Sequence, residues 1–160
     1  MIMLTAGRCA EVVGMCWGEI DTDAATWTVP RERMKSGREH RVPLSPQAMQ
    51  LLDSIPRTSN PFVFPGQSPG SHVSGVSVRR VLHEYFRRTE TVHGFRACFR
   101  QWAAECCPSF PREAAERALA HVVGSEVERA YMRSDLFEIR RQLMQAWADY
   151  LTGRPYQTAP

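Results

Sequence analysis

The chain has 160 residues, of which 43% are hydrophobic, and this size and composition predict one folded domain with its own core rather than a disordered protein. No apolar run approaches the roughly 18 residues of a membrane span, and the N-terminus lacks a basic region followed by an apolar stretch, so we expect a cytoplasmic protein. The formal net charge is only +3, yet the 20 cationic side chains comprise one lysine, Lys35, and otherwise arginines.

The arginines occur in local pairs, which predict either solvated helix faces or basic patches suited to bidentate phosphate contact. These pairs are Arg31/Arg33, Arg38/Arg41, Arg79/Arg80, Arg87/Arg88 and Arg140/Arg141. The solvated face is the simpler interpretation of any single pair. Arginine content alone therefore does not identify nucleic acid as the partner.

The cysteines indicate neither a disulfide framework nor a zinc knuckle, because their number is odd and no CxxC pair occurs. They are Cys9, Cys16, Cys98, Cys106 and Cys107. We expect reduced, mostly buried thiols. A zinc site that joins two histidines to the last two cysteines is disfavoured, because adjacent cysteines chelate poorly.

The first 17 residues predict a helix, since apolar residues recur at helical spacing from about Thr5 to Trp17. Arg8 and Glu11 lie three residues apart, on one face of that helix. Because the helix begins almost at Met1, we expect the chain to have been cut from a longer protein.

A β-hairpin follows the first helix. Residues 26–30 and 39–44 alternate in polarity and flank a glycine-bearing turn, which places Lys35 near the hairpin tip. Ser45 and Pro46 then begin a second helix as its cap and first turn. A loop over residues 56–70 contains one short buried strand or anchor at residues 62–64.

The second half of the chain predicts a series of helices. Their predicted starts are Ser74 or Ser77, His93, Pro111, Ser125 with its capping box, and Asp135 as the last cap. The helix after Asp135 carries an apolar stripe from Leu136 to Leu151 that suits packing either on its own core or on a neighbouring molecule. Residues 153–160 are expected to form a flexible tail. The overall prediction is a mainly α protein with a small antiparallel β-hairpin or sheet, of the α+β class.

One C-terminal stretch concentrates the groups that phosphoryl transfer requires without a metal. It contains His93, Arg96, His121 and Tyr131. A guanidinium matches two phosphate oxygens, a histidine moves protons near neutral pH, and a tyrosine hydroxyl can form a covalent ester.

Together with Arg8 and Lys35, these residues resemble the catalytic domain of tyrosine recombinases, the phage integrase family, and most of all the integrases of prophages and genomic islands. The resemblance covers roughly residues 4–151 and extends to flanking sequence. It includes Thr5-Ala-Gly-Arg8-Cys-Ala-Glu11, Trp17-Gly-Glu-Ile-Asp21, Arg33-Met-Lys35-Ser-Gly-Arg-Glu-His-Arg-Val-Pro-Leu44 and Arg129-Ala-Tyr131.

The resemblance implies a DNA strand transferase that uses neither metal nor nucleotide. Tyr131 would attack a scissile phosphate and form a 3′-phosphotyrosyl link. Because the pKa of a phenol is about 10, the nucleophile needs a base, for which His93 is the candidate. Arg8 and Arg96 would clamp the non-bridging oxygens, where the transition state gathers negative charge.

The remaining residues would support this reaction. Lys35 would protonate the leaving 5′-oxygen, a role that an arginine cannot fill because its pKa is too high. His121 would donate a hydrogen bond to a non-bridging oxygen, and Glu11 would buttress a cation. His40 lies in the matched hairpin sequence but is assigned no chemistry.

The resemblance also implies a catalytic domain over residues 1–152, without the N-terminal DNA-binding domains of the family. It implies double-stranded DNA as the partner and a tetramer on two DNA sites. Without the other domains we expect weak, largely non-specific DNA binding. Two alternatives remain: a non-catalytic DNA-binding remnant of a prophage integrase, and a strand transferase like the type IB topoisomerases.

Overall fold

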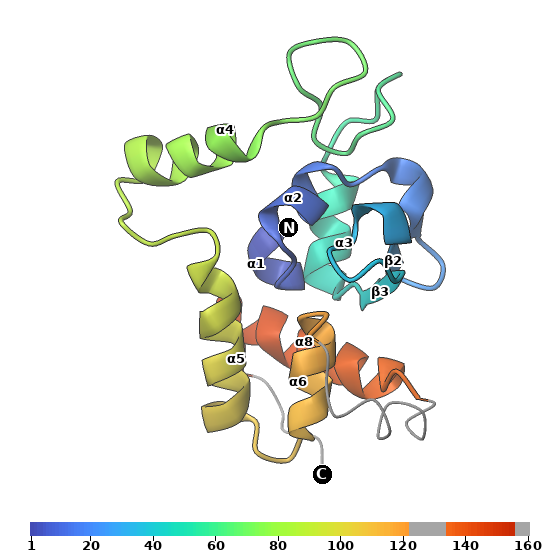
Figure 1. Ribbon diagram of the computed structural model, residues 1–160. Coiled ribbons are helices and arrows are strands. Elements are labelled where there is room, and N and C mark those ends of the chain that lie inside the picture. Colours follow the sequence, from blue (N-terminus) through green and yellow to red (C-terminus); the bar gives the residue numbers. More distant parts are fainter. Residues whose placement is uncertain (122–133, 156–160) are drawn as a thin grey trace.

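A computed structural model describes residues 1–121 and 134–155 of the chain (Figure 1). The first half contains three short helices and a sheet: α1 (Ile2–Thr5), α2 (Cys9–Val13), β1 (Ile20–Asp21), β2 (Thr26–Val29), β3 (His40–Pro43) and α3 (Pro46–Asp53). Two 3₁₀ turns, η1 (Trp17–Glu19) and η2 (Arg31–Arg33), flank the first two strands. The second half is helical: α4 (Gly75–Arg80), the π-helical turn η3 (Val81–Tyr85), α5 (Gly94–Cys106), α6 (Arg112–Ala118) and α8 (Phe137–Leu151).

The sheet is antiparallel in the order β1-β2-β3, and the pairing of Val29 with His40 closes the predicted hairpin. The prediction of a mainly helical α+β fold with a small antiparallel sheet is therefore confirmed. The Ser45 hydroxyl accepts the Ala48 N–H at the start of α3, as the sequence predicted. Val63 is buried and donates its N–H to the Met15 carbonyl, so residues 62–64 do form an anchor.

The predicted first helix is wrong in one respect, because it is broken between α1 and α2. Ala6 adopts a left-handed conformation with φ of 49°, and the Gly7 N–H donates to the Thr5 hydroxyl. A Cβ at Gly7 would lie 2.9 Å from Val12 Cγ2, so only glycine fits this close approach. The break makes Arg8 the N-cap of α2 rather than a residue on a helix face.

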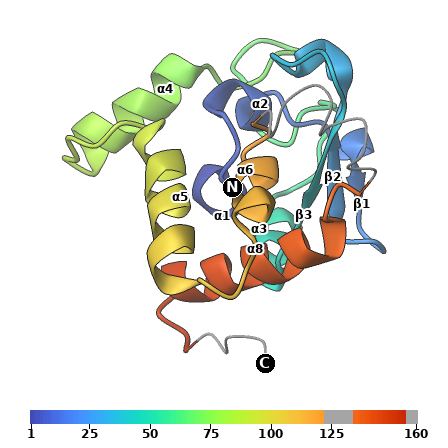
Figure 2. The same cartoon turned by 60° about the horizontal axis from the view of Figure 1, so that its bottom comes forward.

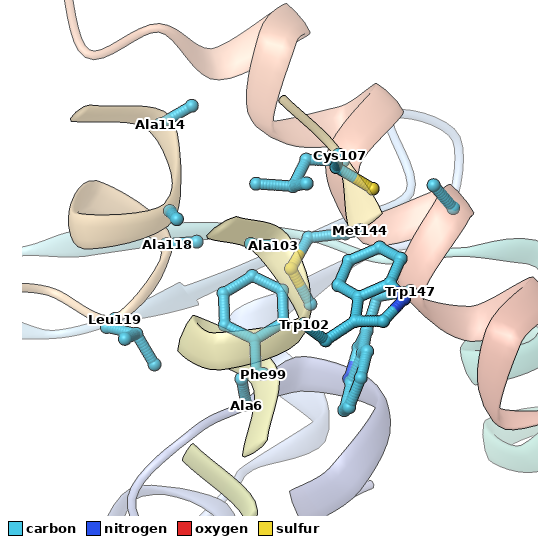
Figure 3. Close-up of a cluster of buried hydrophobic side chains, with 13 residues drawn as sticks. Ala6, Phe99, Trp102, Ala103, Cys107, Ala114, Ala118, Leu119, Met144 and Trp147 are labelled. Atoms are coloured by element: carbon cyan, nitrogen blue, oxygen red, sulfur yellow. The ribbon is translucent and has the colours of Figure 1, made fainter. Parts of the chain in front are cut away.

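Two cores hold the molecule together. The sheet core comprises Val12, Met15, Trp27, Val29, Met34, Val42, Leu44, Ala48, Leu52 and Val63. The helical core comprises Ala6, Phe99, Trp102, Ala103, Cys107, Ala114, Ala115, Ala118, Leu119, Leu143, Met144, Ala146 and Trp147 (Figure 3). Burial of these side chains supplies the main favourable free energy of folding.

Helix α8 lies across one face of the molecule and contacts α1, α3, α5, α6 and β3 (Figure 2). Leu143, Met144 and Trp147 from its apolar stripe are buried in the helical core, and the Trp147 indole donates to the Met3 carbonyl at 2.7 Å. The stripe therefore packs within the chain, and these residues do not form a docking surface for a neighbouring molecule.

Two further sequence predictions, on the start of α8 and on Arg140, need correction. The N-cap of α8 is Leu136, one residue beyond the expected Asp135, whose carboxylate instead accepts the Phe137 N–H at 3.1 Å. Arg140 is buried rather than solvated, because it donates to the Arg41 carbonyl and pairs with Asp135.

The thiols also differ from expectation. Of the five, only Cys107 is buried, whereas Cys98 and Cys106, both on α5, are exposed.

Candidate functional site

Arg8 and Glu11 form a close pair at the start of α2. The Glu11 carboxylate accepts Arg8 Nη1 at 2.7 Å and the Arg8 backbone N–H at 2.9 Å. Glu11 is buried, whereas 28% of the Arg8 side chain is exposed. The carboxylate therefore orients Arg8 while part of the guanidinium stays open to an anion.

Arg96, on α5, is a buried cation of this region. Its Nη1 donates to the Ala6 carbonyl at 2.5 Å and its Nη2 to the Leu119 carbonyl at 2.6 Å. Burial, with a smaller effect of the Arg8 charge, lowers the pKa of Arg96 to about 10, and Glu11 opposes this shift. Arg96 thus stays charged near neutral pH. Because the charges of Arg8 and Glu11 both shift the pKa of Arg96, the three side chains lie close together.

His121, just beyond α6, lies against the same guanidinium. Its Nε2 is 3.5 Å from Arg96 Nη2, and its Nδ1 is 2.7 Å from a carboxylate oxygen of Glu116. The imidazole is 42% exposed and can therefore meet a ligand from solvent. The structure thus brings together Arg8, Glu11, Arg96 and His121 from three separate segments of the chain.

His93 lies at the N-cap of α5 and is exposed. Its carbonyl accepts the Arg96 N–H at 3.1 Å, so the two residues lie one helical turn apart. Among the residues that the structure describes, no hydrogen bond or ion pair joins the His93 ring to Arg8, Arg96 or His121.

Lys35 lies on the exposed turn between η2 and β3, and only the base of this turn is anchored. Arg33 donates through Nη1 to the Glu11 carbonyl at 2.9 Å, and the same nitrogen would lie 2.8 Å from a Cβ added at Gly14. This contact ties the turn to α2. Within residues 1–121 and 134–155, no ion pair or hydrogen bond links Lys35 to the arginines of the site.

Tyr131 and the predicted short helix after Ser125 lie outside the described residues, as does most of the predicted tail. The arrangement of site residues described here therefore does not include the candidate nucleophile.

His40, to which the sequence assigned no chemistry, is a neighbour of the site. Burial is the largest cause that lowers its pKa to about 4, with help from the Arg140 and Arg8 charges and against the Glu11 charge and a hydrogen bond to the Ala118 carbonyl. His40 is therefore neutral at pH 7 and links β3 to the end of α6. Its place in the matched hairpin sequence was the signal that could have identified it.

In the described part of the chain, no group of three or more His, Cys, Asp or Glu side chains is arranged to hold a metal ion. No helix among these residues is long and apolar enough to cross a membrane.

Comparison with known proteins gives a consistent result. The sequence pattern of the phage integrase family matches residues 1–136. The chain is 39% identical over 151 residues to the prophage integrase IntA of Escherichia coli strain K12, covering 92% of this chain and 36% of that protein. It is 35% identical over 168 residues to the integrase of Enterobacteria phage P4, covering 93% of this chain and 38% of that protein.

A solved structure shares the fold. The integrase of transposon Tn1549, determined in complex with circular intermediate DNA, superposes with a TM-score of 0.55 at 14% identity, over 83% of this chain and 55% of that one. The chain spans less than two fifths of the length of the two curated relatives described above.

Proposed function

The chain belongs to the phage integrase family, and from this we propose that it catalyses site-specific recombination of double-stranded DNA by transesterification. In this proposal residues 1–152 form the catalytic domain. The Tyr131 oxygen attacks a scissile phosphate, the bond from phosphorus to the 5′-oxygen breaks, and a 3′-phosphotyrosyl ester forms. The released 5′-hydroxyl is then free to attack the equivalent ester on a partner duplex.

The observation that carries this proposal is the convergence of two guanidinium groups. Arg96 is fixed by two carbonyl groups and Arg8 by the buried Glu11 carboxylate. Two preorganised cations of this kind stabilise the charge that develops on the non-bridging oxygens of a phosphate, at little cost of reorganisation. His121 adds a third polar group beside Arg96.

Proton transfers are assigned to the exposed residues. His93 accepts the phenolic proton of Tyr131, and the Lys35 ammonium gives a proton to the leaving 5′-oxygen. Both side chains are exposed in the free protein, and Lys35 lies on a turn anchored only at its base. DNA binding is expected to bring both of them to the phosphate.

Double-stranded DNA is the proposed partner, with a tetramer assembled on two sites. The arginine-rich composition supports it, since a guanidinium binds phosphate oxygens through a planar fork. The described neighbour was solved with DNA, as its name states.

Trapping of a covalent adduct tests the proposal. The chain is incubated with a pool of nicked duplexes of randomised central sequence, so that release of the short strand beside the nick prevents religation. We expect a DNA adduct that survives denaturation and that is lost in Tyr131→Phe. Tyr150→Phe, a change at an exposed tyrosine on α8, serves as the matched control and should retain the adduct.

The outcomes separate the candidate functions. An adduct that persists in Tyr131→Phe would refute the assignment of the nucleophile. Binding of duplex DNA without any adduct would instead favour the non-catalytic remnant. Sequence-independent relaxation of supercoiled DNA, with no joining of two duplexes, would favour a topoisomerase-like strand transferase.

A further inference from the structure

Four charged or ionisable side chains form a connected row across α5 and α6. Arg100 donates through Nε to Glu116 Oε1 at 2.7 Å, Glu116 Oε2 is 2.7 Å from His121 Nδ1, and His121 Nε2 is 3.5 Å from Arg96 Nη2. Arg96 and Arg100 are four residues apart on α5 and so lie on one face. The row links the site to a residue, Glu116, that the proposed mechanism does not use.

Glu116 is held firmly in its ionised form. Its side chain is only 13% exposed, and burial alone would raise its pKa, but hydrogen bonds from His121 and Arg100 outweigh burial and lower it. The His121 backbone N–H also donates to the Glu116 carbonyl at 2.9 Å. Hydrogen bonds to Glu116 therefore hold both the main chain and the side chain of His121 in place.

An ionised carboxylate can only accept hydrogen bonds, which fixes where the imidazole carries its proton. Nδ1 must bear the hydrogen that Glu116 accepts. The neutral ring then presents a lone pair at Nε2, on the side of Arg96, and it can donate from Nε2 only after taking up a second proton.

We propose that Glu116 is a positioning residue for His121, that Arg100 holds Glu116, and that His121 donates to the DNA phosphate in its doubly protonated form. This inference rests on the proposed function for the identity of the phosphate. Arg96 from α5 and Glu116 from α6 contact the ring, and Arg100 and Arg112 pair with Glu116, with Arg112 3.9 Å from the carboxylate. The charges of Arg8 and Glu11 act on Arg96 from the start of α2. Glu116 supplies the negative charge that balances the imidazolium among these cations.

Nuclear magnetic resonance of the full chain tests the proton position without DNA. In the wild type, ¹H–¹⁵N correlations of the neutral His121 ring should place the proton on Nδ1. In Glu116→Gln the amide oxygen should turn towards Arg100, which needs an acceptor, so that the amide NH₂ faces Nδ1 and the ring proton moves to Nε2. An unchanged proton position in this variant would overturn the proposal.

Single-turnover cleavage of the nicked duplex pool provides the second readout. Glu116→Ala should slow cleavage about 10- to 100-fold, by analogy with the removal of a carboxylate that orients a metal-bound histidine, with little change in DNA affinity. Glu116→Gln should slow cleavage less than Glu116→Ala, because the amide still holds the imidazole through a hydrogen bond.

Arg100→Ala and Arg112→Ala form a matched pair, since both arginines are exposed but only Arg100 hydrogen-bonds the carboxylate. Arg100→Ala should slow cleavage, whereas Arg112→Ala should remain within about twofold of wild type. Equal effects of the two substitutions, or effects confined to DNA affinity, would overturn the positioning role.

The two proposals fail in different ways. If wild-type protein forms no adduct, the proposed function fails. The proton position in Glu116→Gln still decides whether Glu116 determines which ring nitrogen of His121 carries the proton. If Tyr131→Phe abolishes the adduct but Glu116→Gln behaves as wild type in both readouts, the function stands and the inference about Glu116 is wrong.

Discussion

Arg96 combines a packing role with its proposed contact to phosphate. Because its guanidinium satisfies two buried carbonyl groups, Arg96→Ala should lower the free energy of unfolding by about 2–5 kcal/mol. Arg96→Lys should cost about 1–3 kcal/mol, since an ammonium does not reproduce the planar fork. Urea denaturation followed by tryptophan fluorescence measures both changes.

Arg31→Ala is the control for Arg96, because the Arg31 side chain is 75% exposed. It should remain within about 0.5 kcal/mol of the wild type. Equal stability of Arg96→Ala and Arg31→Ala would contradict the packing role.

His40 predicts a pH dependence of stability. Its pKa is about 4 in the folded chain and about 6.5 when unfolded, so between these values the unfolded chain binds a proton that the native chain does not. The contribution of the neutral ring to the free energy of unfolding is therefore fully present above pH 6.5, and it is lost as the pH falls towards 4. We expect a loss of about 2 kcal/mol between pH 7 and pH 4.5 from this group.

Paired denaturation curves at the two pH values isolate this effect. His40→Gln should lose less stability on acidification than the wild type, whereas His72→Gln, at an exposed loop position, should behave as the wild type. Parallel losses in all three proteins would show that His40 titrates normally in the folded chain.

The sequence predicted some candidate site residues that lie together in the fold, but not the side chains around them. Arg8, Glu11, Arg96 and His121 were predicted together from their order and flanking motifs, and they converge in space. Glu116 was missed because its proposed role rests on hydrogen bonds to Arg100 and His121. These bonds depend on how α5 packs against α6, which the sequence does not show.

At the scale of elements, α4 and η3 differ from the rest of the molecule. They extend away from the two cores (Figure 1), and neither contains a buried residue. Since local opening is easiest where few apolar contacts are lost, amides of residues 75–85 should exchange at least about tenfold faster than those of α5 and α8. Hydrogen exchange with mass spectrometry measures this, and protection equal to that of α8 would contradict it.

Elements were predictable where local chemistry determines them. The hairpin turn, the Ser45 cap and the proline breaks act within a few residues, so the sequence contains all that is needed. The break between α1 and α2 was missed because the left-handed turn at Ala6 and the close approach of Gly7 to Val12 exist only in the folded chain. The burial of Arg140 was missed because its partner, the Arg41 carbonyl, lies 99 positions earlier in the sequence, on β3.

At the scale of the whole molecule, the proposed binding of DNA predicts a strong dependence on salt. Each phosphate contact should add about −0.9 to the slope of log K against log salt concentration. Arg38 lies on the same exposed turn as Lys35, so Arg38→Ala should weaken binding and reduce the slope by about one contact. Arg154→Ala, an equal loss of charge beyond α8, should leave the slope unchanged.

Fluorescence anisotropy of a labelled duplex at several salt concentrations compares the two variants. Equal slopes for Arg38→Ala and Arg154→Ala would place the turn away from the DNA and would count against Lys35 as the proton donor.

The burial of Arg96 bears on how the sequence would change in descendants that no longer needed the proposed recombination activity. A descendant that still had to fold would keep Arg96 and Glu11, because purifying selection on stability would retain both. The exposed positions Lys35 and His93 have no such protection and would drift first. The presence of Lys35 and His93 in this chain is therefore stronger evidence of selection for catalysis than the presence of the buried Arg96.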